Sequence, residues 1–299
     1  MAILSVPNHM VVGARTGFLS AVRENSGLPY NRVAMVVDMQ GRTQKLVDIG
    51  EAPMPVEDVA RSQVQTLIEK SMDLSVKAWE TTVAIDGDDV KDDQTGQLLP
   101  KVKSAGNRFM RHLNQLVYKT LNGGDGTTYG SCYDSQDFFD SDHSDEGAKY
   151  TTSQDNEQTL ALTPDNFETV LVAANAFKDD QGESSDYSYN LLTVPSAYKR
   201  IAAQICGNPN IYNTGDNETN PWAGELNYQV SNQMDSTAWI LSAESEATKP
   251  IIIAMLEMPH MMAEWYDPKQ PNGGIFYFKF RARYDVFYGD WRLAIQGNT

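Results

Sequence analysis

The stretch Leu98–Leu121, LLPKVKSAGNRFMRHLNQLVYKTL, has the clearest periodicity in the chain. Its apolar residues recur at helical spacing, which places them on one face: Val102, Phe109, Leu113, Leu116, Val117 and Leu121. Pro100 suits the first turn of a helix, where a missing N–H costs nothing. Lys119 suits the last turn, and Asn122-Gly123-Gly124 is a typical helix end. The stretch therefore predicts a long helix with a single apolar stripe.

The residues at the N-terminal end have no clean periodicity. Gly13, Gly17, Gly27 and Pro29 interrupt every pattern between Met1 and Pro29. We expect residues 1–30 to form an arm with little structure of its own, with one short helix around Phe18–Glu24.

Strand signals follow this arm. Val33–Val37 is rich in β-formers, Gln40-Gly41 offers a turn, and Gln44–Ile49 continues as a strand, which predicts a hairpin. Ser62–Val76 alternates loosely, as strands in a long, partly exposed projection do. Trp79–Ile85 has the composition of a better-buried strand.

Beyond the long helix the chain mixes helices and strands. Asp125–Asn156 is a long polar loop, and Thr163-Pro164 is a natural N-cap and first residue of a second helix. Further segments predict a helix from Pro195 to about Ile205 and the following strands: Leu191–Val194, Asn227–Val230, Ala238–Ser242, Ile251–Glu257 and Ile275–Tyr288. Because these elements do not alternate strictly, the expected class is α+β.

Composition limits the function classes. The 299 residues carry a net charge of −16, and 41% are hydrophobic, so the chain can bury a core. A strongly acidic chain repels phosphate backbones and anionic membranes, and assembly of many copies has to rest on apolar, shape-matched contacts. No apolar run is long enough for a membrane span, and the first ten residues do not resemble a signal peptide. The distant cysteines, Cys132 and Cys206, indicate a reducing cytoplasm rather than a disulfide framework.

The chain offers few candidates for chemistry. It has four histidines, and we expect His112 to be a packing or surface residue and His260 a core residue. His143 follows two aspartates, so Asp140, Asp142 and His143 could ligate a metal in a hydrolase, although a catalytic metal usually needs a fuller ligand set. The acidic run Asp86–Asp93 lacks the register of a calcium loop and is better explained as a cap before the long helix.

Motifs typical of enzymes are missing from the sequence. No Gly-x-Ser-x-Gly elbow and no P-loop occurs, because Gly123-Gly124-Asp125-Gly126 lacks the lysine that would follow. Neither cysteine lies in a CxxC motif. We therefore expect no enzyme, no catalytic residue, no cofactor and no metal.

Four segments, in order, resemble the Mu-like prophage major head subunit (gpT) family. Cys132–His143 is similar to the family's Asp-Gly-x-x-Phe-Phe-x-x-x-His loop, with Ser135 where the family has glycine. The others are Trp79–Val83 with Asp88–Gly96, Trp239–Leu241 with Lys249–Ile252, and Tyr284–Trp291 with Arg292-Leu293-Ala294. Together they span about Gly50 to the C-terminus.

This resemblance implies the tailed-phage (Hong Kong-phage type) major capsid fold. Its parts would be an N-terminal arm, an extended loop, a peripheral domain with a spine helix, and an axial domain. Placed on this chain, they correspond to residues 1–30, 31–77, 78–159 with 254–299, and 160–253, with the spine helix at about 98–121. The last strands would return to the peripheral sheet.

The resemblance also implies a function. Copies would self-assemble into hexamers and pentamers of an icosahedral shell, built in the host bacterial cytoplasm, that encloses double-stranded DNA without specific binding. Scaffold, portal and decoration proteins are possible partners, and no membrane is involved. Eight residues are our assembly candidates: Arg32, Gln40, Gly41, Arg42, Pro53, Pro55, Arg61 and Trp222. The metal-dependent hydrolase stays open as the alternative, and so does a cement or portal-type protein.

Overall fold

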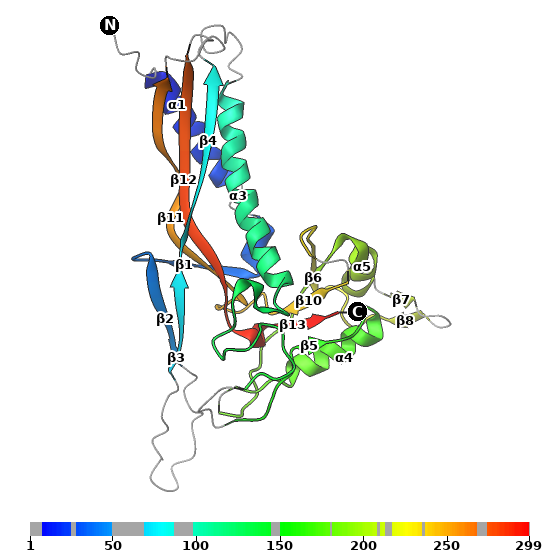
Figure 1. Ribbon diagram of the computed structural model, residues 1–299. Helices are drawn as coiled ribbons and strands as arrows, with labels where there is room; N and C mark the ends of the chain where they lie inside the picture. The colour runs from blue at the N-terminus through cyan, green and yellow to red at the C-terminus, as the bar shows by residue number, and fades with distance from the viewer. Residues whose placement is uncertain are drawn as a thin grey trace.

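The computed structural model describes residues 8–24, 28–49, 69–86, 98–144, 150–179, 181–207, 210–212, 217–234, 237–267 and 274–298. A tall column of long elements dominates the molecule: the strands β11 (Ile251–Asp267) and β12 (Ile275–Tyr288) and the helix α3 (Leu98–Asn122). Figure 1 shows a second region of short strands and helices beside the base of this column.

The column is built on a four-stranded sheet in the order β1-β11-β12-β4, where β1 is Ala34–Asp38 and β4 is Lys77–Asp86. The alternation expected for Ile275–Tyr288 is confirmed, because Phe276, Phe278 and Phe280 are buried while the residues between them are half-buried. Phe280 stacks on Phe18 of helix α1 (Asn8–Glu24) at a ring-centroid distance of 4.2 Å. One face of the sheet is therefore covered by α1 and α3.

The second region contains a five-stranded sheet in the order β5-β13-β10-β6-β9. Its strands are β5 (Glu157–Gln158), β6 (Leu191–Val194), β9 (Asn227–Val230), β10 (Trp239–Ser242) and β13 (Ala294–Gly297), and its helices are α4 (Pro164–Asn175) and α5 (Lys199–Gly207). The predicted cap of α4 is confirmed, since the Thr163 side chain accepts a hydrogen bond from the Asn166 N–H.

Short elements complete the fold. Two strand pairs lie outside the larger sheets, and single 3₁₀ turns connect the longer elements. Their bounds are β2 (Thr43–Ile49) with β3 (Glu69–Ser75), β7 (Asn210–Tyr212) with β8 (Asn217–Thr219), and η1 (Pro29–Arg32), η2 (Thr127–Tyr129), η3 (Ser196–Tyr198) and η4 (Trp291–Leu293). In the part of the chain that the structure describes, no helix is long and apolar enough to cross a membrane.

The N-terminal residues are more ordered than expected, because the short helix predicted around Phe18–Glu24 is only the end of a longer one. Residues 8–24 form the 17-residue helix α1, which packs on α3 and the sheet. The crossing of α1 and α3 is close at Gly106, where an added Cβ would lie 2.8 Å from the Phe18 carbonyl oxygen and 2.9 Å from the Ala21 Cβ. Tertiary packing thus offsets the low helix propensity of the α1 glycines, a contribution that local pattern does not reveal.

The predicted hairpin has the right strands but the wrong pairing. β1 pairs in parallel with β11, residue 34 against residue 251, and β2 pairs with β3. The turn at Gln40-Gly41 therefore connects two different sheets. The long helix, by contrast, is confirmed, with Pro100 in its first turn and its end at Asn122.

The C-terminal residues also divide differently from the expectation that 254–299 all return to the peripheral sheet. β12 does so, but β13 pairs with β10 and β5 in the five-stranded sheet. β1, placed in the expected extended loop 31–77, is likewise an edge strand of the long sheet.

Two burial predictions are wrong. Of the strand around Trp79–Ile85 only Ile85 is buried, because β4 lies at the edge of the sheet. His260 is half-buried rather than a core residue. The acidic run Asp86–Asp93 lies outside the described residues from position 87 onward, so its expected role as a helix cap stays a prediction.

Candidate assembly site

The β2–β3 pair forms a projection whose root is fixed to the sheet. A small apolar cluster at the root buries Met39, Leu74, Val76, Ile252 and Ala254. Backbone hydrogen bonds from Met39 N–H to the Met255 carbonyl (2.8 Å) and from Val76 N–H to the Arg42 carbonyl (3.0 Å) tie both ends of the projection down. Within the described ranges, β2 and β3 pair only with each other. The projection is therefore anchored at one end and offers two free strand edges.

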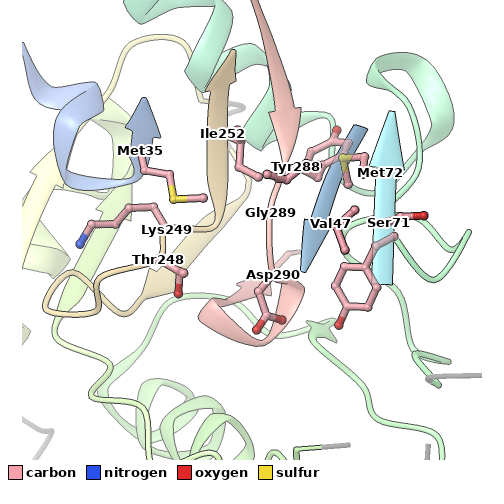
Figure 2. A pocket seen from close by; sticks show the side chains of 12 residues that line it. Met35, Val47, Ser71, Met72, Thr248, Lys249, Ile252, Tyr288, Gly289 and Asp290 are labelled. Atoms are coloured by element: carbon pink, nitrogen blue, oxygen red, sulfur yellow. The ribbon is translucent and has the colours of Figure 1, made fainter. Parts of the chain in front are cut away.

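A cavity of about 150 Å³ lies between the projection and the body. Figure 2 shows Val47, Ser71 and Met72 of the projection on one side and Lys249, Thr248 and Met35 on the other, with Tyr288, Gly289 and Asp290 between. Leu46, Tyr133 and Ile252 complete the lining. The contact between projection and body is thus apolar and incompletely filled, unlike the tightly packed main core.

Three assembly candidates lie together at the turn that leads into β2. Gln40 is exposed, and its N–H donates to the Gln44 side-chain oxygen. Gly41 has open space around it, since an added Cβ would meet only the Thr43 carbonyl at 3.8 Å. Arg42 is exposed. The structure brings these three together, and their part in assembly remains a prediction.

The other described candidates contact their own chain. Arg32 forms two hydrogen bonds to the Glu244 carboxylate, at 2.5 and 2.6 Å, which tie η1 to the loop after β10. Trp222 packs edge-on against Phe167 at 5.3 Å. Pro53, Pro55 and Arg61 lie outside the described residues. The eight candidates thus do not form one site.

His143 is fully buried and has no free ring nitrogen. Its Nδ1 lies 2.6 Å from Asp134 Oδ2, a carboxylate that is itself 1% exposed. Its Nε2 lies 3.2 Å from Asn156 Oδ1 and 3.3 Å from the Phe138 carbonyl oxygen. The ring stacks on Trp291 at 4.2 Å. His143 therefore holds the long loop against the C-terminal residues.

The hydrolase alternative is not supported by this arrangement. Asp142 is exposed, the Asp140 carboxylate accepts the Asp142 N–H at 3.0 Å, and the carboxylate that contacts His143 is that of Asp134. Among the residues that the structure describes, no three acidic, histidine or cysteine side chains gather as metal ligands. His112, as expected for a packing residue, lies 2.8 Å from the Tyr284 hydroxyl.

Two structural residues of the loop were not found from the sequence. The Asn156 side chain is fully buried and donates to the carbonyls of Phe138, Trp291 and Ala294. Asp134 is the partner of His143, and its spacing of nine residues within the family-like loop motif could have indicated it. Ser135, which stands where the family has glycine, adopts a positive φ of 69°. That conformation explains the glycine of the motif.

Both cysteines are buried thiols without a disulfide. Burial raises the pKa of Cys132 well above its ordinary value, and burial raises the pKa of Cys206 to about 12. Because the thiolate is the reactive form, both are inert packing residues.

Comparison with known proteins identifies relatives of the chain. The major capsid protein of Escherichia phage Mu is 32% identical over 120 residues, which are 40% of this chain and 38% of that protein. The Mu-like prophage FluMu major head subunit of Haemophilus influenzae is 27% identical over 114 residues, 38% of this chain and 36% of that protein. The matched parts therefore span less than two fifths of these relatives.

The fold has solved counterparts. A chain of the procapsid of bacteriophage JBD30 superposes with a TM-score of 0.53 at 19% identity, covering 98% of this chain and 76% of that one. The tailed-phage major capsid fold expected from the sequence is thus confirmed.

The sequence profile described as Mu-like prophage major head subunit gpT matches residues 8–161, just over half of the chain. The match begins well before Gly50, so the resemblance reaches further toward the N-terminus than the four segments indicated, and the third and fourth segments lie outside it. The chain belongs to the Mu-like prophage major head subunit gpT family.

Proposed function

We propose that this chain is the major capsid protein of a tailed-phage head, and that its copies assemble into hexamers and pentamers of an icosahedral shell around double-stranded DNA. The observation that carries the proposal is the β2–β3 projection on a tailed-phage capsid fold. The family and the fold support the same role, and we propose no catalytic activity.

The projection is an incomplete structure by itself. An isolated two-stranded hairpin is marginally stable in water, and open strand edges are templates for further contacts. In this chain the root is fixed by a small apolar cluster, while Val47 on β2 is 43% exposed. Burial against a neighbouring copy would offset the cost of ordering the projection.

Charge sets the conditions under which copies associate. At −16 each, two copies repel one another at low ionic strength. Salt screens this repulsion, with a Debye length of about 10 Å at 0.1 M, while apolar contacts are retained. Assembly should therefore be promoted by salt.

The parts of the fold have proposed roles in the shell. The arm 1–30, extended loop 31–77, peripheral domain 78–159 with 254–299, and axial domain 160–253 are our proposed division, with β1 and β13 as exceptions that join other sheets. We propose assembly in the host bacterial cytoplasm, with scaffold, portal and decoration proteins as further partners.

The test is assembly of purified protein followed by electron microscopy and sedimentation as salt is raised. We expect closed shells, and we expect Leu74→Ala, which opens a cavity in the root cluster, to reduce their yield. Val172→Ala, at an exposed position of α4, is the matched control, because it leaves both the root cluster and the projection intact. A protein that stays monomeric under all salt and crowding conditions would overturn the proposal.

Copy number separates this role from that of a portal or cement protein. A shell protein is present in hundreds of copies per particle, whereas a portal is present in far fewer. Quantification of the chain against DNA in purified particles makes the distinction.

A further inference from the structure

Helix α3 is basic in an acidic chain. Its 25 residues include Lys101, Lys103, Arg108, Arg111 and Lys119 and no acidic residue. The helix thus contributes +5 to a chain of net −16, which leaves −21 for all other residues. Positive and negative charges are therefore strongly segregated in this molecule, and its net charge does not describe each of its surfaces.

The cations of α3 lie on one face. Besides Pro100 in the first turn, the described exposed positions of α3 are Lys101, Ser104, Arg108, Arg111, Gln115 and Lys119. At 100° per residue these six fall within an arc of about 80°, opposite the buried stripe of Val102, Phe109, Leu113 and Val117. From residue 101 to residue 119 the stripe is about 27 Å long, equivalent to about eight base-pair steps of duplex DNA.

Three cations of the stripe, Arg108, Arg111 and Lys119, have no acidic partner among the residues that the structure describes. Lys103, on the flank of the helix, pairs with Glu24 at 2.8 Å. The sheet offers a contrast, since Lys279 pairs with Glu80 and Arg283 with Glu257. Lys279 and Arg283 of the long sheet are thus matched by acids, whereas Arg108, Arg111 and Lys119 of α3 are available to an external anion.

The residue types of the stripe favour phosphate over protein. Lysine, arginine, serine and glutamine are the side chains that contact DNA phosphates. Protein interfaces are centred on aromatic or apolar anchors, and the outward face of α3 presents none among its six exposed residues. A row of cations without an apolar centre fits a polyanion that is contacted weakly and without sequence preference.

We propose that the outward face of α3, through Arg108, Arg111 and Lys119, contacts the phosphate backbone of duplex DNA and is the face of the subunit turned toward packaged DNA. This inference rests on the proposed function, because an enclosed duplex is the polyanion that a shell protein meets. The net charge alone predicts that the chain repels DNA, whereas the basic face of α3 would bind it locally.

The test is anisotropy of a labelled 30-base-pair duplex with unassembled protein, titrated at a series of low salt concentrations. If three phosphates are contacted, the slope of log K against log salt is about −2.7. The double variant Arg108→Gln with Arg111→Gln should reduce its magnitude by about 1.8. Glutamine retains helix propensity, and thermal unfolding checks the fold.

Two matched variants sharpen this test. Lys199→Gln with Arg200→Gln removes the same charge from exposed positions of α5 and should leave the slope unchanged. Arg108→Lys with Arg111→Lys keeps the charge and should retain binding. Since the protein is unassembled, the result is independent of whether it forms shells.

Three results would overturn the proposal: absence of duplex binding at the lowest salt, equal losses in the α3 and α5 variants, or binding of poly-glutamate but not of duplex that is lost in the α3 variant. The last result would assign the stripe to an acidic protein partner. Duplex binding with a slope lost selectively in the α3 variant supports it.

Discussion

The Nδ1 atom of His143 lies 2.6 Å from Oδ2 of Asp134, and both side chains are buried. The contact holds the two ends of the 134–143 segment together. On its other sides the imidazole contacts Asn156 and Trp291, which connect the segment to the C-terminal residues. His143, a candidate metal ligand in the sequence, is therefore a buried residue that stabilises the packing of the loop in the folded protein.

Replacement of His143 by alanine should destabilise the protein by about 3–5 kcal/mol, because it leaves a buried carboxylate without its partner. Chemical denaturation measures the loss. Asp142→Asn, on an exposed side chain of the same loop, is the control and should change stability by less than about 0.5 kcal/mol. Equal effects of the two substitutions would contradict the role of the buried pair.

Ser135→Gly should stabilise the protein. Ser135 has a φ of 69°, and this conformation costs a non-glycine residue about 1–2 kcal/mol of folded-state strain, which glycine would relieve. Glycine also loses more conformational entropy on folding than serine, but this costs only about 0.5–1 kcal/mol. Ser131→Gly, in the same loop without a positive φ, should instead destabilise. Thermal unfolding of both variants tests this, and a rise in Tm for Ser131→Gly alone would refute the explanation.

Gly106→Ala tests whether helix propensity or packing against α1 has the larger effect on stability at this position. Propensity alone would stabilise α3 by about 1 kcal/mol. The added methyl, however, meets the Phe18 carbonyl at 2.8 Å and the Ala21 Cβ at 2.9 Å, and such overpacking costs about 1–3 kcal/mol. We expect net destabilisation and faster hydrogen exchange in α1. Gly126→Ala, which has nothing within 4 Å, is the control, and a more stable Gly106→Ala protein would show that the crossing is loose.

The Arg32–Glu244 contact should make stability depend on acid. Hydrogen bonding from Arg32 lowers the pKa of Glu244 below its ordinary value. A carboxylate with a lowered folded-state pKa stabilises above its unfolded pKa, and this contribution is lost as pH falls through the folded value. Glu244→Gln should therefore cost about 1–2 kcal/mol near pH 7 and progressively less below pH 4.5. A cost that is independent of pH from 7 to 3 would rule the ion pair out as its source.

Local patterns predicted the elements whose signals are local. The alternation of Phe276, Phe278 and Phe280 gave β12 its bounds, and Thr163 marked the start of α4, because periodicity and capping are encoded by near neighbours. Pairing partners could not be predicted in this way. Ala34 pairs with Ile251, and the choice of β11 over β2 depends on packing between distant parts of the chain.

In the candidate assembly site, too, local features were predicted and long-range contacts were not. The turn at Gln40-Gly41 was predicted from residue types, whereas the bonding of Arg32 to Glu244, 212 residues away, was not. Of helix α1 only the part from Phe18 to Glu24 was predicted, because Gly13 and Gly17 lower the helix propensity of the preceding residues. Its stability comes from packing of Phe18 in the core.

The proposed function requires that copies of this chain form a closed shell. The most direct measurement is a cryo-EM reconstruction of particles assembled from the purified chain at moderate salt. We expect closed icosahedral particles in which this chain forms both five-fold and six-fold capsomers, with the β2–β3 projection seated on a neighbouring copy. Monomers at every salt concentration, or rings with no closed shell, would contradict it.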